Sequence, residues 1–376
     1  MHNVGIIGFG FIGKVHAWGY ANLPFFYDPV PLHARIAAVC TSRPETAEAG
    51  RALLGAERAV TDYRRITEDP AIDIVHICTP NHLHKDALLS AMAHGKHIYC
   101  DKPLTATLAE ACEVRKALAG YRGTAQMTFH SRFFPAVMRA KQLIDEGFLG
   151  MLLEFRACFL HAGSADPNAP LKWKLSAAAG GGVIADLGSH VLDLMRWLAG
   201  DFGEISAMTK IAFPDRPSAD DPRVRVPVDA EDCVMLLARL KNGGVGQIEA
   251  TKTATGTEDE LSFDLHGTRG ALRFNSTRPH HLEIYDATVA DKPLGGRRGW
   301  TRVDVGQRLP APASGFPGGK LTLGWLRAHL ACLANFLYDV AAGRPGSPGL
   351  DTGIAVQGLM ECIRRSAAER RWVVKS

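Results

Sequence analysis

Residues 4–13 read Val4-Gly5-Ile6-Ile7-Gly8-Phe9-Gly10-Phe11-Ile12-Gly13, an apolar run that leads directly into a G-x-G-x-x-G turn. Residues 14–23 suit a helix, so the turn joins a strand to a helix. In such a turn the first glycine permits the bend, the second lets the backbone approach a pyrophosphate, and the third lets helix and strand pack closely. The helix N-terminus then faces the anion. The pattern predicts a dinucleotide site; the alternative is a tight turn without a ligand. The residues expected to bind are Gly8, Gly10, Phe11, Ile12 and Gly13.

The length and charge of the chain limit what it can be. It has 376 residues, 46% of them hydrophobic and 22% charged, which exceeds the size at which single cores stop growing and indicates two domains. The net charge of +4 is spread without blocks of like sign. Nucleic acids and anionic membranes require such blocks, so we expect neither as a partner. A small anionic ligand remains compatible with this charge.

The cysteines and the N-terminus indicate a cytoplasmic protein. The eight cysteines are dispersed and form no C-x-x-C pair, which favours reduced thiols. We find neither a signal-peptide pattern nor an apolar run of 18 residues, and the N-terminus leads directly into the first strand.

Residues 1–128 alternate short apolar strands with helical stretches. Strands are expected near 4–8, 35–40, 73–78, 97–100 and 123–128. Helices are expected near 11–23, 44–54, 81–94 and 105–119. This rhythm predicts a Rossmann domain, a doubly wound parallel sheet. Residues 24–31 contain three prolines, which cannot continue a helix and predict an inserted loop that could form part of a pocket rim.

Residues 129–376 predict a second domain of the α+β class with an open, mostly antiparallel sheet. A helix is expected from Pro135 to about Glu146 and an amphipathic one near 186–199. Strands are expected at 152–160 and near 203–213, 229–240, 245–253, 261–267 and 270–275. Glycines and prolines indicate a long loop over 291–320, and two late helices, about 322–342 and 352–369, are expected to pack near the first domain. The open sheet face could join subunits into a homodimer or homotetramer.

Two motifs follow strands of the parallel sheet, at the carboxyl edge where such sheets bind ligands. Thr79, Pro80 and Asn81, with His84, come after residues 74–77 and are placed to touch the cofactor. The alternative for this motif is simple strand-to-helix punctuation, with Asn81 as a helix cap.

The second motif, Asp101-Lys102-Pro103, follows the strand at 97–100. Most lysines are solvated surface charges. Lys102, however, is expected where the nicotinamide ring lies, and its ammonium could hold a substrate hydroxyl or influence a neighbouring acid.

A third motif runs from Gly180 to Asp193 as G-G-G-V-I-A-D-L-G-S-H-V-L-D. Asp186, His190 and Asp193 are spaced i, i+4 and i+7, so one helical face would carry all three polar groups. The preceding glycines allow the backbone to approach a ligand or the other domain closely. The alternative is a helix N-cap at Asp186 with a satisfied core histidine.

A metal site is not expected, although several potential ligands crowd one stretch. Strand positions point to alternating faces, and no compact zinc-type spacing is present. The residues concerned are His76, Cys78, His82, His84, His94, His97 and Cys100.

The choice between NAD and NADP depends on the end of the second strand, which reads Val39-Cys40-Thr41-Ser42-Arg43. NAD selectivity usually needs a carboxylate here. None precedes Glu45, and Ser42 with Arg43 could bind a 2′-phosphate, so the sequence favours NADP slightly over NAD. The alternative is that Arg43 starts the next helix in solvent.

Together, the strand–GxGxxG opening, Thr79-Pro80-Asn81 with His84, Asp101-Lys102-Pro103 and GGG-x-x-x-D-x-G-x-H-x-x-D resemble the glucose-fructose oxidoreductase / inositol dehydrogenase (Gfo/Idh/MocA) family over nearly the whole chain. The resemblance implies a substrate bound between the two domains and oxidation or reduction of sugars or cyclitols. The chain departs from the family pattern in having Asp101 for a glutamate, in the insertion at 24–31, and in His130.

By this resemblance Lys102, Asp186 and His190 form the catalytic set, and Arg132 and Trp173 lie near the substrate. We expect His190 to be the general base that takes the hydroxyl proton while hydride passes to the nicotinamide. Lys102 would stabilise the developing alkoxide and Asp186 would orient the substrate. Two alternatives stay open: a glycosidase that oxidises its substrate transiently with NAD, and a non-catalytic NAD(P)-binding sensor.

Overall fold

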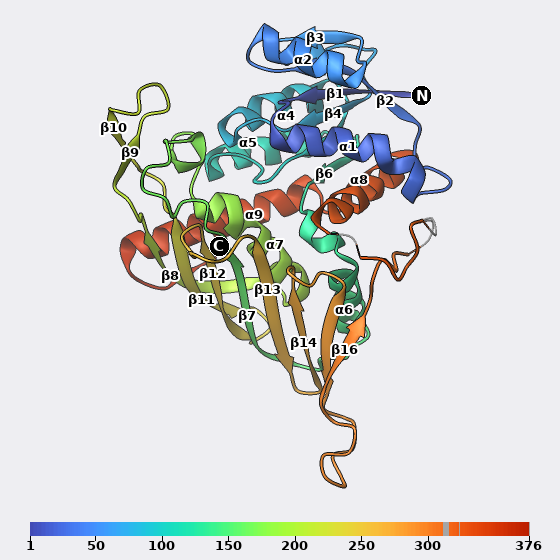
Figure 1. Cartoon of the computed structure of the whole chain (residues 1–376), viewed down its shortest axis with the longest axis vertical. Coiled ribbons are helices and arrows are strands. Elements are labelled where there is room, and N and C mark those ends of the chain that lie inside the picture. The colour runs from blue at the N-terminus through green and yellow to red at the C-terminus, as the bar shows by residue number, and fades with distance from the viewer. Residues whose placement is uncertain (311–315, 323, 376) are drawn as a thin grey trace. The chain divides into compact units, whose positions relative to one another are not determined.

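The computed structural model describes residues 1–310, 316–322 and 324–375 (Figure 1). The chain forms two compact units, each built from separate segments. The first contains Met1–Phe133, Leu309–Gly319 and Trp325–Gln357. The second contains Phe134–Arg308, Lys320–Gly324 and Gly358–Ser376.

The first unit contains a six-stranded sheet of order β3-β2-β1-β4-β5-β6 in which every pair is parallel. Its strands are β1 (His2–Ile7), β2 (Ala34–Cys40), β3 (Arg58–Val60), β4 (Ile74–Ile77), β5 (His97–Cys100) and β6 (Ala125–Met127). Its connecting helices are α1 (Phe11–Phe26), α2 (Pro44–Leu54), α3 (Arg64–Thr67), α4 (His84–Ala93) and α5 (Leu108–Leu118). This order confirms the doubly wound Rossmann class. The strand order reverses beside β1, so ligands are expected at the carboxyl ends of β1 and β4.

The helix α1 is longer than predicted. It runs through Pro24 to Phe26, so the expectation that the insertion begins at residue 24 was wrong. Proline removes one helical hydrogen bond, yet the Tyr27 N–H still donates to the Leu23 carbonyl at 2.9 Å. Phe26 and Tyr27 are buried, and the Arg327 guanidinium lies over both rings. We infer that this burial outweighs the lost hydrogen bond.

The late helix α8 (Trp325–Ala341) belongs to the first unit, where it packs against α1. Trp325 stacks on Phe11 with ring centroids 5.6 Å apart. The Gln126 amide, on β6, donates to the Cys332 carbonyl at 2.9 Å. The last helix, α9 (Leu350–Glu369), begins in the first unit and continues into the second at Gly358.

The second unit contains a nine-stranded sheet of order β16-β15-β14-β13-β7-β12-β11-β8-β17. Its strands are β7 (Leu152–Leu160), β8 (Phe202–Lys210), β11 (Cys233–Leu240), β12 (Val245–Thr251), β13 (Glu260–Gly267), β14 (Gly270–Asn275), β15 (His281–Asp286), β16 (Trp300–Asp304) and β17 (Val373–Val374). Among the described strands of this sheet, only β7 and β12 pair in parallel, which confirms a mostly antiparallel α+β unit. The helices α6 (Pro135–Asp145) and α7 (Ser189–Leu198) pack against its strands.

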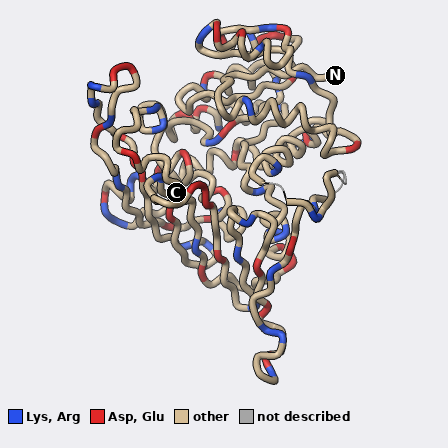
Figure 2. Tube along the Cα trace, in the orientation of Figure 1, with Lys and Arg blue, Asp and Glu red and all other residues tan. Residues whose placement is uncertain are grey.

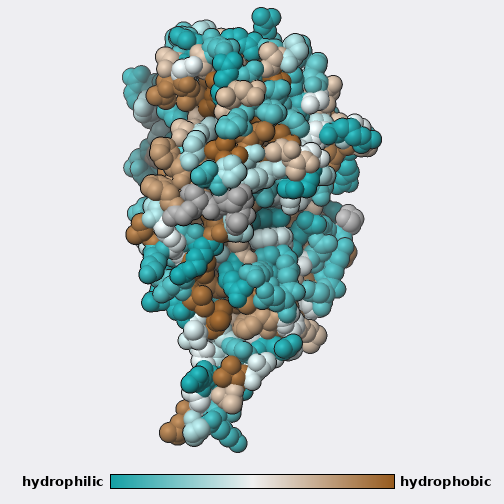
Figure 3. All heavy atoms as spheres, turned by 90° about the vertical axis from the view of Figure 1, so that its right-hand side faces the viewer, coloured by the Kyte–Doolittle hydropathy of each residue, from teal (hydrophilic) through white to brown (hydrophobic). Residues whose placement is uncertain are grey.

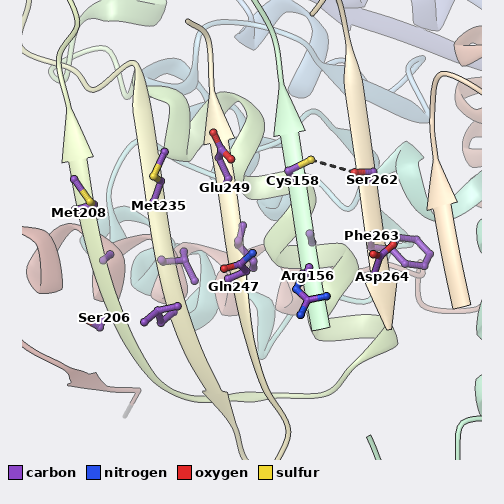
Figure 4. Close-up of a pocket in the computed structure, with 15 residues that line it drawn as sticks. Arg156, Cys158, Ser206, Met208, Met235, Gln247, Glu249, Ser262, Phe263 and Asp264 are labelled. Atoms are coloured by element: carbon purple, nitrogen blue, oxygen red, sulfur yellow. Dashed lines mark hydrogen bonds between the residues drawn. The ribbon is translucent and has the colours of Figure 1, made fainter. Parts of the chain in front are cut away.

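The opposite face of this sheet exposes alternate side chains. Along β11, residues 234, 236, 238 and 240 are buried, whereas Met235, Leu237 and Arg239 are exposed. This alternation is typical of a strand with one solvated face. A hollow of about 560 Å³ opens on this face, and Figure 4 shows Met208 and Met235 next to each other on β8 and β11. We call this surface the open face.

Several short elements were not predicted. β3 and α3 are too short for a periodic pattern, and so are β9 (Asp215–Pro217) and β10 (Arg225–Pro227), which form a separate two-stranded sheet. The expected loop over 291–320 was wrong in part, because β16 lies inside it; residues 311–315 of that stretch lie outside the described residues. Trp300 begins β16, and the Arg273 guanidinium lies 3.9 Å from its ring centroid.

Charged residues of both signs are interspersed along the trace in Figure 2, in agreement with the charge distribution of the sequence. Hydrophobic and hydrophilic residues are interspersed on the side shown in Figure 3. Among the described residues, no helix has the length and apolar character needed to cross a membrane.

Candidate active site

The glycine turn has the geometry that a dinucleotide requires. Gly8 has φ +91°, and a Cβ there would lie 2.6 Å from the Cys78 carbonyl. A Cβ at Gly13 would overlap the Gly8 carbonyl oxygen. An added Cβ at Gly10 would meet no atom within 4 Å, so space is open in front of this backbone. Two glycines therefore close the turn and the third borders free space at the start of α1, which fits a bound pyrophosphate.

The two strand-end motifs are joined by His84. This side chain is fully buried, with Nε2 2.8 Å from the Thr79 carbonyl oxygen and Nδ1 3.0 Å from that of Pro103. Burial lowers the pKa of His84, which opposes the effect of these two carbonyl acceptors. His84 thus holds the Thr79-Pro80-Asn81 turn against the Asp101-Lys102-Pro103 turn. It could support a cofactor site only through these turns.

Lys102 follows β5, and Gly8 and Thr79 follow β1 and β4, so all three come from the carboxyl ends of adjacent strands. Asp101 accepts a hydrogen bond from the Thr128 hydroxyl at 2.5 Å, which fixes the start of the Lys102 turn. Burial and the Lys102 ammonium lower the pKa of His130 to about 3. His130 is therefore neutral at ordinary pH, so Lys102 faces no second cation there.

His76 on β4 and Cys78 just after it share a buried partner that the sequence did not indicate. His16 Nδ1, on α1, lies 3.1 Å from both His76 Nδ1 and Cys78 Sγ. Burial lowers the pKa of His16 to about 4. Within the described part of the chain, no cluster of His, Cys, Asp and Glu could hold a metal ion.

In the second unit, Asp186 lies in a π-helical turn, Ile184–Gly188, that leads directly into α7. Asp186 is therefore not a helix N-cap. A π turn is wider than an α turn, so Asp186 and His190 do not have the spacing of an ideal α-helical face. Gly182, with φ +101°, allows the turn to begin against Glu231, whose carboxylate accepts the Ile184 N–H at 3.0 Å. π turns occur frequently at functional sites.

The Asp186 carboxylate contacts two ammonium groups of its own unit. Lys252 Nζ lies 2.9 Å from Oδ2, and Lys174 Nζ lies 2.9 Å from Oδ1. The Asp186 side chain is 16% exposed. The sequence predicted neither lysine, because Lys252 is distant in sequence and belongs to no recognisable motif.

The remaining predicted site residues are distributed over both units. His190 and Asp193 are buried on α7, and the Phe159 ring centroid lies 5.9 Å from that of His190. Trp173 is 38% exposed in the second unit, whereas Arg132 is buried in the first. Lys102 thus belongs to one unit, and Asp186 and His190 belong to the other.

Arg43 is the residue before α2, and its carbonyl accepts hydrogen bonds from the hydroxyls of Thr41 at 2.9 Å and Thr46 at 3.0 Å. These bonds fix the backbone after β2. Ser42 and Arg43 are exposed, and among the described residues the Arg43 guanidinium has no ion pair or hydrogen bond. A cation is therefore available after the second strand.

Two family models match this chain. Residues 2–129 match the oxidoreductase family with an NAD-binding Rossmann fold, and residues 137–273 match the GFO/IDH/MocA C-terminal domain. The chain therefore belongs to the GFO/IDH/MocA oxidoreductase family. It is a nicotinamide-dependent oxidoreductase of the sugar and polyol dehydrogenase class, which transfers a hydride between the cofactor and a hydroxyl-bearing carbon.

Named relatives match nearly the full length. Levoglucosan dehydrogenase of Pseudarthrobacter phenanthrenivorans is 35% identical over 385 residues, covering 99% of this chain and 97% of that protein. Inositol 2-dehydrogenase of Rhizobium meliloti is 26% identical, covering 98% of each chain. A solved structure of levoglucosan dehydrogenase in complex with NADH and levoglucosan has a TM-score of 0.94 and 35% identity, covering 100% of this chain and 99% of that one.

Proposed function

We propose that this enzyme oxidises a ring hydroxyl of an anhydrosugar, sugar or cyclitol, with Lys102, Asp186 and His190 acting on one substrate. The observation that carries this proposal is the position of Asp186, which lies in the π turn four residues before His190. The glycine turn of the same chain has room for a pyrophosphate. The substrates named for the relatives, levoglucosan and inositol, support the substrate class.

Each residue has a distinct role in this proposal. His190 takes the hydroxyl proton as general base, because imidazole ionises near neutral pH. Lys102 donates to the oxygen as negative charge develops on it. Asp186 accepts a hydrogen bond from a substrate hydroxyl and so orients the ring, while Arg132 and Trp173 border the substrate. The nicotinamide, when bound, supplies the hydride acceptor. Gly10, Phe11 and Ile12 at the start of α1, with Thr79, Pro80 and Asn81, hold the cofactor, and His84 and Asp101 support their turns.

A spectrophotometric screen tests the reaction. Levoglucosan, myo-inositol, D-xylose and D-glucose are each incubated with NAD or NADP, and reduced nicotinamide is followed by its absorbance. We expect cofactor reduction with at least one of them. Hydrolysed sugar without net reduction would instead support the glycosidase alternative, and cofactor binding without any turnover would support the sensor.

The free state of all eight cysteines supports a cytoplasmic location for this chemistry.

We also propose that Arg43 favours NADP by meeting its 2′-phosphate. Charge-assisted hydrogen bonds to phosphate contribute enough that Arg43→Ala should weaken NADP binding about 10- to 100-fold. NAD affinity should change less than about twofold, because NAD has no 2′-phosphate. Fluorescence titration with both reduced cofactors measures this. The matched control is Arg51→Ala on α2, where Arg51 pairs with Glu48. Equal losses of affinity for both cofactors, or no loss, would refute this role of Arg43. NAD is included in the titration because the similar levoglucosan dehydrogenase structure contains NADH.

We propose further that two copies of the chain pair through the open face to form a homodimer or part of a homotetramer. Met208, Met235 and Leu237 are 62%, 46% and 52% exposed there, and apolar side chains on an uncovered sheet face favour a second copy. The substitutions Met235→Lys and Leu237→Lys together should lower the mass measured by sedimentation, to that of one chain from a homodimer or to that of two chains from a homotetramer. Circular dichroism checks that the variant is folded. A monomeric wild type, or an unchanged mass in the variant, would contradict the proposal.

A further inference from the structure

Lys252 occupies a fixed position beside Asp186. It is the first residue after β12, and its backbone is held on both sides: its N–H donates to the Asp232 carbonyl and its carbonyl accepts from the Ser164 N–H, both at 2.8 Å. Its side chain is only 7% exposed. The side chain therefore starts from a backbone position fixed by two hydrogen bonds, and nearly all of it is removed from solvent.

The hydrogen-bonding capacity of this ammonium exceeds what the protein uses. Lys252 Nζ carries three donors and lies 2.9 Å from Asp186 Oδ2. Among the residues that the structure describes, this carboxylate is the only polar side-chain partner of Nζ. Leaving donors of a buried charge without acceptors is costly, and such groups are usually completed by a ligand or water.

Lys174 provides an internal comparison. Its ammonium contacts the same carboxylate, at 2.9 Å from Oδ1 and 3.1 Å from Oδ2, but its side chain is 48% exposed. Water can therefore satisfy its remaining donors, and an exposed ion pair of this kind contributes little. The two lysines share one partner and differ in burial. Only Lys252 needs acceptors that bulk solvent does not supply.

We propose that Lys252 is a substrate-binding residue that donates a hydrogen bond to a hydroxyl oxygen of the ring, next to the hydroxyl that donates to Asp186. Asp186 only accepts and Lys252 only donates, so together they match a pair of neighbouring hydroxyls, each of which can do both. The chemical class recognised is a cyclic vicinal diol. This inference rests on the proposed function, because it assigns Asp186 to the substrate.

Steady-state kinetics on a sugar found in the screen test this role. Lys252→Met should raise KM about 10- to 100-fold, the effect of removing a hydrogen bond to a charged group, with a smaller change in kcat. Lys174→Met should raise KM by no more than about threefold. Lys252→Leu, which also lacks a donor, provides a second variant should the first fail to fold. A normal thermal unfolding midpoint identifies folded variants.

Deoxy analogues separate a binding role from a merely structural one. The informative analogue lacks the hydroxyl that accepts a hydrogen bond from Lys252. The wild type should have a higher KM for this analogue than for the parent polyol. In Lys252→Met this discrimination should be lost, so that the ratio of the two KM values approaches one. Lys174→Met should keep the wild-type ratio. A structural defect would raise both KM values and leave their ratio unchanged. An unchanged ratio in folded Lys252→Met, or in folded Lys252→Leu, would overturn the proposal.

Calorimetric binding of the same polyols separates failure of this inference from failure of the proposed function. If no sugar is oxidised but a polyol binds, and Lys252→Met weakens that binding at least about tenfold, the reaction is wrong and the diol site stands. If sugars are oxidised and Lys252→Met binds them as the wild type does, the reverse holds. Absence of any polyol binding to the wild type would overturn the diol site as well.

Discussion

Replacement of Lys102 by alanine should lower kcat about 10²- to 10³-fold, the usual effect of removing one donor to a developing oxyanion. Lys102 follows β5 in a turn that the Asp101–Thr128 hydrogen bond and His84 hold in place. The loss should therefore arise from the missing ammonium rather than from a displaced backbone. Stopped-flow measurement of cofactor reduction at saturating substrate reports the chemical step directly.

Two further variants make the Lys102 result specific. Lys102→Arg keeps the charge but changes the donor geometry, so it should recover only part of the rate. Lys85→Ala removes an ammonium on α4 that pairs with Asp86 and Glu113, and should leave kcat within about twofold of the wild type. Near-normal turnover by Lys102→Ala, with intact cofactor binding by fluorescence, would exclude Lys102 from the reaction.

Replacement of His190 by alanine should lower kcat about 10²- to 10⁴-fold, the range that general-base catalysis contributes. His190 lies in the first turn of α7, directly after the π turn that holds Asp186. Added imidazole should restore part of the rate in His190→Ala, because a free base can occupy the space of the missing ring. In His190→Ala, removal of the hydroxyl proton should become rate-limiting. The primary isotope effect on kcat for substrate deuterated at the carbon that gives up the hydride should therefore fall.

The control for His190 keeps the shape of the side chain. His190→Asn retains polarity without a comparable base, so its rate should stay low and imidazole should not restore it. Because His190 is buried, the melting temperature of each variant must be compared with the wild type. Rates of His190→Ala close to wild type, or equal rescue of both variants, would contradict the role of general base.

Local patterns predicted the first unit well. The glycine turn lies within ten residues, and each strand-end motif follows its strand directly, so sequence order alone brings them to one edge of a parallel sheet. Short elements such as β3 and β16 could not be predicted, because three to five residues do not establish a period. The end of α1 was predicted wrongly because Pro24 usually stops a helix, whereas here the packing of Phe26 against Arg327 outweighs that preference.

The substrate half of the site was predicted less completely. The spacing of Asp186 and His190 suggests an ordinary helix, and nothing in it distinguishes an α turn from a π turn. Lys252 follows a strand remote from Asp186 in sequence, and only the arrangement of β12 beside the π turn brings them together. A lone lysine after a strand carries no signal of burial, so side-chain contacts were needed to find it.

The closed form of the glycine turn has a consequence for engineering. Side chains are excluded at Gly8 and Gly13 by backbone atoms of Cys78 and Gly8, which cannot move without disturbing β1 and β4. Directed evolution toward a different nicotinamide cofactor should therefore accumulate its successful changes at Thr41, Ser42, Arg43, Glu45 and Thr46, whose side chains are polar and at least partly exposed. The diphosphate loop should stay invariant.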